Sequence, residues 1–97
     1  MQYLMIDWLD MDDDDEPCRI YVALGPDRRE VCRIDMYRNG VYVMCDEGSP
    51  ELKPDPYPDN IFALPGAPIV RNLRPAQFYS YWEEIKEIQC RPMDIFF

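Results

Sequence analysis

The first half of the chain alternates between apolar and polar positions with a period of two, the pattern of half-buried β-strands. Three such runs, residues 3–8, 18–24 and 31–37, are separated by an acidic segment and by the turn-forming Gly25-Pro26-Asp27. The alternation predicts three antiparallel strands that share an apolar face. The residues expected on that face are Leu4, Ile6, Trp8, Ile20, Val22, Leu24, Cys32, Ile34 and Met36.

Asn39-Gly40 predicts a tight hairpin after the third strand, because this pair tolerates the positive φ angles of a type I′ turn. A two-residue loop pairs Arg38 with Val41 and Met36 with Val43. The fourth strand is then expected on the same apolar face as Cys32, Ile34 and Met36. Its contribution to that face is Val41, Val43 and Cys45.

The other face of this four-stranded meander is expected to be unusually aromatic for a solvent-facing surface. Either the proline-rich segment or the tail 93–97 covers it, or it contacts a partner or a second copy of the chain. The residues expected there are Tyr3, Met5, Tyr21, Tyr37, Tyr42 and Met44.

The second half of the chain predicts a long connection followed by a helix. Residues 46–68 contain six prolines, which indicate an irregular path with at most a short turn at 60–64. Pro75 is acceptable in the first turn of a helix, and an apolar stripe formed by Phe78, Trp82 and Ile85 extends the helix to about Gln89. The sequence predicts a single α+β domain, 1–97: a four-stranded antiparallel meander with one C-terminal amphipathic helix on its apolar face.

Negative charge is concentrated in two segments of a chain whose net charge is −9. Residues 10–16 carry −6 and residues 46–59 carry −4, so the rest of the chain is nearly neutral. This balance argues against direct binding to nucleic acid or to an anionic membrane and favours a basic protein partner. The first segment and the Asn39-Gly40 turn are expected at one end of the meander, so a single acidic patch requires the second segment to fold back toward them.

Three interpretations of the 10–16 segment remain open: a solvated loop, a weak divalent-cation site, or a loop that recognises a basic cleft. An EF-hand loop needs Gly at its sixth and Glu at its twelfth position, and counting from Asp10 those positions hold Asp15 and Tyr21. The calcium-loop pattern therefore fails. An acidic recognition loop would accelerate encounter with a basic protein and lose binding as salt rises.

The side-chain inventory predicts a protein that is not an enzyme and needs no cofactor. The chain has no histidine and no threonine, only Ser49 and Ser80 as serines, and no phosphate-binding glycine loop. The spacing of Cys18, Cys32, Cys45 and Cys90 matches neither a zinc site nor a dense disulfide framework, so reduced cysteines are expected. No signal peptide or membrane span is readable, which predicts a cytoplasmic protein.

Several short motifs, taken in order, resemble a family of small bacterial α+β proteins that forms a domain of unknown function. The motifs are Tyr3 with Trp8, Glu16-Pro17, Tyr21, Glu30-Val31-x-Arg33-Ile34, Tyr37 to Gly40, and Phe78-x-x-x-Trp82. The chain departs from the family pattern at Gly48-Ser49-Pro50 and the prolines that follow. The resemblance implies the α+β fold and no catalytic residues.

In its size, acidity and lack of catalytic groups, the chain is also similar to the immunity proteins that bacteria encode beside toxins. This likeness is a general analogy. The leading hypothesis is an immunity protein that binds and inhibits a basic, nuclease-type toxin. The alternatives are an anti-defence protein from a phage or mobile element that mimics nucleic acid, and a regulatory domain that self-associates as a homodimer through its tyrosine face. The expected partner-binding residues are Asp10, Asp12, Asp13, Asp14, Asp15, Glu16, Tyr37, Tyr42, Asp46, Glu47 and Glu51.

Overall fold

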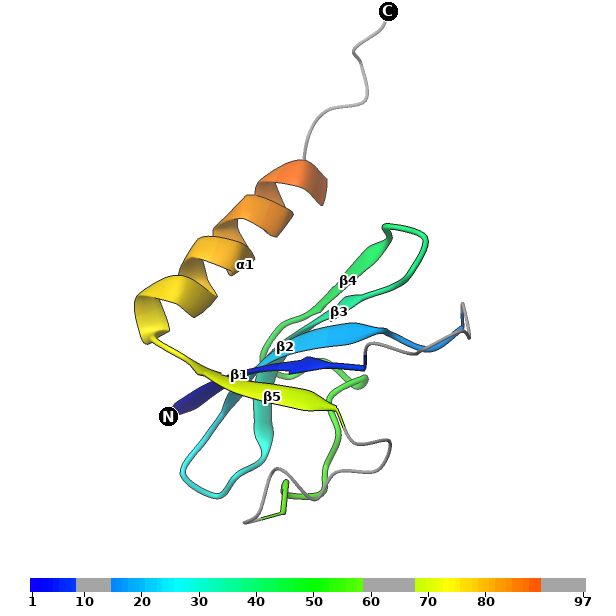
Figure 1. The fold of residues 1–97 in the computed structure, drawn as a ribbon. Coiled ribbons are helices and arrows are strands. Elements are labelled where there is room, and N and C mark those ends of the chain that lie inside the picture. The colour runs from blue at the N-terminus through cyan, green and yellow to red at the C-terminus, as the bar shows by residue number, and fades with distance from the viewer. Residues whose placement is uncertain (9–14, 59–67, 90–97) are drawn as a thin grey trace, which may run out of the picture.

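The computed structural model describes residues 1–8, 15–58 and 68–89, and within them five strands form one antiparallel sheet followed by a helix (Figure 1). The spatial order of the strands is β4-β3-β2-β1-β5. The predicted α+β class and the four-stranded meander are confirmed, and a fifth strand is added beside β1. The elements are β1 (Gln2–Asp7), β2 (Arg19–Leu24), β3 (Glu30–Met36), β4 (Tyr42–Cys45), β5 (Ile69–Leu73) and α1 (Pro75–Gln89).

Strand β5 was not predicted, because its sequence does not alternate. Ile69-Val70-Arg71-Asn72-Leu73 has two apolar residues, two polar ones and one more apolar residue, and it follows the proline-rich region. It pairs antiparallel with β1, with Tyr3 opposite Leu73 and Asp7 opposite Ile69. The β-branched pair Ile69-Val70 was the one local signal for a strand. The pairing itself depends on a contact between distant parts of the chain.

Helix α1 has the predicted bounds but packs on the face of the sheet opposite to the predicted one. Phe78 and Ile85 are buried against Tyr3 and Tyr21, which were expected on an outer aromatic face. The aromatic face is therefore covered by α1, and the part of the proline-rich segment that contains Tyr57 lies on the other face. The tail 93–97 and the short turn expected at 60–64 lie outside the described residues. Tyr3 and Tyr21 lie beneath the helix, so they are not presented for self-association.

The aliphatic face of the sheet is covered by the segment that follows β4, on the other side of β1 and β5 from α1 (Figure 1). Tyr57 packs there against a cluster that includes Leu4, Ile6 and Val22. Arg28 in the β2–β3 turn fastens this segment: its Nη2 donates to the carbonyl of Pro58 at 2.7 Å, and its own carbonyl accepts from the Tyr57 amide at 2.9 Å. Arg28 adopts a φ of 64°, an uncommon conformation for a residue other than Gly.

The β3–β4 hairpin is one residue out of the predicted register. The Tyr37 amide donates to the carbonyl of Val41 at 2.9 Å, so the loop has three residues and ends on Gly40 with a φ of 86°. Met36 pairs with Tyr42, and a one-residue slip moves every side chain of a strand to the other face. Val43 and Cys45 therefore lie beside Asp35 and Arg33, and the prediction that they share a face with Cys32, Ile34 and Met36 is wrong.

The side chains of β3 also lie on the faces of the sheet opposite to those predicted. Ile34 pairs with Tyr21 and faces α1, whereas Arg33 pairs with Val22 and Asp35 with Ile20. Two charged side chains therefore occupy the aliphatic face, where Cys32, Ile34 and Met36 were expected. The sequence pattern of β3 did not reveal this arrangement, because both faces of the sheet are covered and each accepts apolar side chains.

Candidate partner-binding site

The aliphatic face carries a hollow of about 380 Å³ at the end of the sheet where β1 finishes. A second hollow of about 330 Å³ shares three of its lining residues and continues toward Tyr57 and Pro58. The two therefore form one depression that runs beneath the proline-rich segment. The lining residues of the first hollow are Trp8, Glu16, Pro17, Ile20, Arg33, Asp35, Tyr37 and Lys53.

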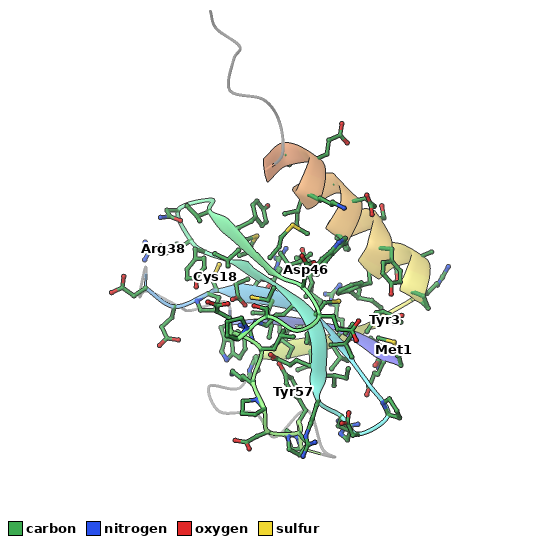
Figure 2. The ribbon with its side chains drawn as sticks, turned by 180° about the vertical axis from the view of Figure 1, so that it is seen from behind. Met1, Tyr3, Cys18, Arg38, Asp46 and Tyr57 are labelled. Carbon is green, nitrogen blue, oxygen red and sulfur yellow. The ribbon has the colours of Figure 1, made fainter. Side chains whose placement is uncertain are left out.

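Backbone hydrogen bonds beyond the regular strands bring distant parts of the sequence to this hollow. The Trp8 amide donates to the Cys18 carbonyl at 2.8 Å, and the Cys18 amide donates to the Met36 carbonyl at 2.9 Å. These bonds hold the end of β1 and the residues before β2 against the end of β3. Figure 2 shows Cys18 and Arg38 together at this end, with Met1 at the opposite end of the sheet.

A buried charged triad, Glu30, Arg33 and Asp35, lies beside the depression, which Arg33 and Asp35 line. Their side chains are 0%, 9% and 10% exposed, respectively. Arg33 pairs through Nη1 with Glu30, its Nε lies 2.9 Å from Asp35 Oδ1, and its Nη2 donates to the Glu51 carbonyl at 3.0 Å. Burial opposes the Arg33 charge, but the Asp35 and Glu30 carboxylates outweigh it and raise the pKa of Arg33.

Glu30 also ties the covering segment to the sheet. Its Oε2 accepts from the Tyr57 hydroxyl at 2.6 Å, and its Oε1 accepts from the Lys53 amide at 2.8 Å. Burial and the hydrogen bond to Glu30 raise the pKa of Tyr57, so its hydroxyl remains a proton donor. Every oxygen of this buried carboxylate thus has a partner within the chain, as buried charges require.

Asp35 is less well compensated than Glu30, and it faces the hollow. Burial raises the pKa of Asp35, and the opposing attraction of Arg33 and Lys53 only partly offsets that effect. Burial also raises the pKa of Tyr37, with further contributions from Asp35 and Glu16. The hollow therefore combines two carboxylates with aromatic walls, and the charge on one of those carboxylates is disfavoured.

The structure brings together only part of the predicted partner-binding set. Glu16 and Tyr37 line the same hollow, and Asp15 is exposed next to Glu16 in the chain. Tyr42 packs against the core beneath α1, so the two tyrosines expected on one face lie on opposite faces. Four predicted residues lie outside the described ranges: Asp10, Asp12, Asp13 and Asp14.

Asp46 and Glu47 of the second acidic segment do not join Asp15 and Glu16 in one patch, whereas Asp55 of that segment lines the second hollow. Asp46 and Glu47 are exposed and lie close enough to Cys32 to raise its pKa, whereas Glu16 acts on Tyr37. Cys32 and Tyr37 are toward opposite ends of β3, roughly 15 Å apart at the rise of a strand. Glu51 is exposed, and its carboxylate accepts from the Ser49 hydroxyl at 2.8 Å.

Six residues that line the first hollow were not among the predicted site residues: Trp8, Pro17, Ile20, Arg33, Asp35 and Lys53. Trp8 was expected in the core, and it does pack partly against the aliphatic cluster. The sequence contained a signal for the triad. Arg33 and Asp35 occupy alternate positions of a strand that is expected to lie between two other strands, so their side chains share one face of the sheet. Recognising it required knowledge of which face of β3 is covered.

The described residues contain neither a metal-binding cluster nor a membrane-spanning helix. Within 1–8, 15–58 and 68–89, no three Asp, Glu, His or Cys side chains are grouped so that they could hold a metal ion. In the same ranges, no helix is long and apolar enough to cross a membrane. Cys18, Cys32 and Cys45 are free thiols, as expected, and Cys90 lies outside the described residues.

The thiol of Cys32 is expected to react slowly. Burial, together with the nearby carboxylates of Asp46 and Glu47, raises the pKa of Cys32 to about 11. At pH 8 its alkylation by iodoacetamide should be about a hundredfold slower than in the urea-unfolded chain, because only the thiolate reacts. Replacing both carboxylates, D46N/E47Q, should accelerate the reaction. Peptide mass spectrometry measures the rate, and equal rates in folded and unfolded chains would contradict this assignment.

The fold and the hollow define a small α+β protein with a mixed aromatic and charged surface site. Comparisons of the chain with protein-family models, with curated proteins and with solved structures found no match. The resemblance to a domain of unknown function therefore stays a prediction, and the function is inferred from the chain's own residues.

Proposed function

We propose that this protein is a non-enzymatic inhibitor of immunity type that binds a basic, nuclease-type toxin through the end of the sheet where Glu16 and Tyr37 meet. One observation carries the proposal: the described end of the acidic segment, Asp15 and Glu16, is exposed at a hollow with aromatic walls. Acidic residues and a partly buried aromatic side chain are thereby offered together on one surface.

The two components of this surface act at different ranges. Clustered carboxylates attract a basic partner over long distances and accelerate its encounter. Affinity usually comes from aromatic and other anchors that become desolvated at the centre of an interface. Tyr37 is half-buried and Trp8 lies at the same hollow, so a partner could desolvate both on docking.

A nuclease-type toxin fits this chemistry because its substrate cleft must attract phosphates and is therefore basic. An inhibitor that occupies such a cleft needs negative charge and shape, and it needs no bond-making groups. The absence of histidine and the net charge of −9 agree with that role. The immunity class itself is an analogy, and co-purification with the product of the neighbouring gene tests it directly.

A nucleic-acid mimic is the second candidate, and the position of Asp46 and Glu47 favours it. These acids are separated from Glu16 along β3, so acidic side chains are distributed over the molecule and not confined to one loop. A mimic would compete with DNA or RNA for many unrelated basic proteins, whereas an immunity protein would bind one toxin. Competition assays against several nucleic-acid-binding proteins distinguish the two.

Charge reversal in the acidic segment should slow capture of the toxin. For D13K/D14K/D15K we expect the association rate at low salt to fall by about tenfold to a hundredfold, because steering depends on local charge. The matched control is E83K/E84K/E87K, which changes the net charge equally on exposed positions of α1. Stopped-flow fluorescence over a range of salt concentrations measures the rates. An equal slowing in both variants would remove the acidic segment from the recognition site.

A further inference from the structure

We propose that the hollow receives a single Lys or Arg side chain, with Asp35 and Glu16 as its carboxylate partners and Trp8 and Tyr37 as its aromatic walls. The inference rests on the proposed function and specifies how the basic partner is anchored. The volume of about 380 Å³, continuous with a further 330 Å³, is in the range of small-ligand sites, about 300–1,000 Å³.

The charge of the buried groups favours a cation. With both carboxylates ionised, the triad of Glu30, Arg33 and Asp35 has one negative charge in excess. Of the exposed charges that line the depression, Glu16 and Asp55 add two negative charges and Lys53 offsets one of them. Glu30 is already saturated by Arg33, Tyr57 and Lys53 within the chain. Asp35 is therefore the carboxylate that gains most from a cation entering the hollow.

Arg33 does not convert the hollow into an anion site, although it contributes to the lining. Its Nη1 is directed at Glu30, and its Nη2 donates to the Glu51 carbonyl and lies 3.8 Å from the Cys45 sulfur. Its Nε lies at Asp35. Its two terminal nitrogens thus donate hydrogen bonds within the chain, and Nε, which donates none, is buried in the ion pair with Asp35. A carboxylate ligand would have to displace one of these groups.

Lys53 lies at the junction of the two hollows and competes with an incoming cation. It lines both of them, its side chain is exposed, and its charge lowers the pKa of Asp35. Only the backbone amide of Lys53 is used to hold Glu30, so the ammonium can be removed without loss of that hydrogen bond. The substitution Lys53→Met should therefore strengthen binding of an external cation.

The aromatic residues complete a site for a cationic side chain. A Lys or Arg head group within ~6 Å of a Trp or Tyr ring gains a favourable cation–π interaction, and the apolar stem packs on the same rings. Trp8, Ile20 and Pro17 supply apolar lining beside Tyr37. The hollow thus matches both parts of a long basic side chain, its stem and its charge.

The test uses the whole chain and small probes: N-acetyl-arginine amide, N-acetyl-lysine amide and, as the anionic control, N-acetyl-glutamate amide. NMR titration at neutral pH and low salt should show saturable shifts of the Trp8 indole N–H with the two cations only. Asp35→Asn should weaken arginine binding about tenfold, the size of a lost charge-assisted hydrogen bond. Lys53→Met should tighten it severalfold, and E83Q/E84Q on α1 should leave it unchanged.

Three results would overturn the inference: saturation by the glutamate probe, shifts spread over the acidic surface without saturation at Trp8, or affinities that do not depend on Lys53 or Asp35. Lys53→Met leaves the triad intact, so it tests the site even if Asp35→Asn perturbs the fold. These probes do not involve the toxin. Failure here together with slowed capture by D13K/D14K/D15K would reject the hollow as the anchor while leaving the proposed function in place.

Discussion

Replacing Arg33 with Met is expected to lower the free energy of unfolding by about 3–5 kcal/mol, as observed when one partner of a buried ion pair is removed. The change leaves the Glu30 and Asp35 carboxylates buried without their guanidinium, with side-chain exposures of 0% and 10%. It also removes the donor to the Glu51 carbonyl, which holds the covering segment. Urea denaturation followed by tryptophan fluorescence measures the loss.

A triple variant, E30Q/R33M/D35N, separates loss of pairing from loss of packing. It removes all three charges and leaves no uncompensated ion, while the new amide at position 30 keeps an oxygen for the Tyr57 hydroxyl. We expect it to be more stable than Arg33→Met alone, since neutral replacement of a whole buried ion network is often tolerated. If the triple variant is as unstable as the single one, the triad acts through shape and not through charge.

Acidification provides a second check on the Arg33 variant. In the wild-type protein the pKa of Asp35 is already raised, mainly by burial and against the attraction of Arg33. The folded state thus holds this proton to a higher pH than the unfolded chain does, so ionisation of Asp35 lowers stability as pH rises. Without Arg33, the stability lost when Asp35 ionises becomes larger. The difference in the free energy of unfolding between wild type and Arg33→Met should therefore be largest near neutral pH. It should shrink as the pH falls toward the pKa of free carboxyl groups.

Replacing Phe78 with Ala is expected to cost about 3–5 kcal/mol, the range for large aromatic side chains in a core. Phe78 is fully buried, and its ring centroid lies 5.1 Å from that of Tyr3 and 6.0 Å from that of Trp82. With Ile85, it supplies the buried contacts by which α1 covers the aromatic face. Chemical denaturation monitored by circular dichroism measures the effect.

The matched control is Ile88→Ala on the same helix. Ile88 is 52% exposed, so its loss should change stability by only about 0.5 kcal/mol, typical of surface positions. A similar cost for both substitutions would mean that the described packing of α1 is wrong. The arginine-probe titration of the Phe78→Ala variant should remain close to wild type while the protein is folded, because the hollow is on the opposite face of the sheet.

The two faces of the sheet thus have different roles. The face beneath α1 is a conventional core of aromatic and aliphatic side chains. The other face combines an aliphatic cluster with the triad and the hollow, and among the described residues the segment after β4 covers it. Charged side chains in such a partly covered position cost stability, and function is a common reason for that cost.

Local signals in the sequence predicted most elements well. Period-two alternation placed three strands, the Asn39-Gly40 turn placed a fourth, and Pro75 with the Phe78-Trp82-Ile85 stripe placed the helix within its observed bounds. The end of the acidic segment was correctly expected near the Asn39-Gly40 turn, where Glu16 and Tyr37 now share a hollow. These features depend on neighbours in the sequence, so the sequence carries enough information to predict them.

The sequence by itself determined the strand and helix segments, the concentration of negative charge and the lack of histidine chemistry. Only the tertiary structure decided the register of β3 with β4, the addition of β5, and which face of the sheet is covered by α1 and which by the segment of Tyr57. The physical reason is that alternation marks two faces without saying what will pack on each. When both are covered, one by α1 and one by the segment of Tyr57, the pairing of β3 with β2 decides where Arg33 and Asp35 lie. A single residue in the hairpin loop then decides which side chains of β4 lie beside them.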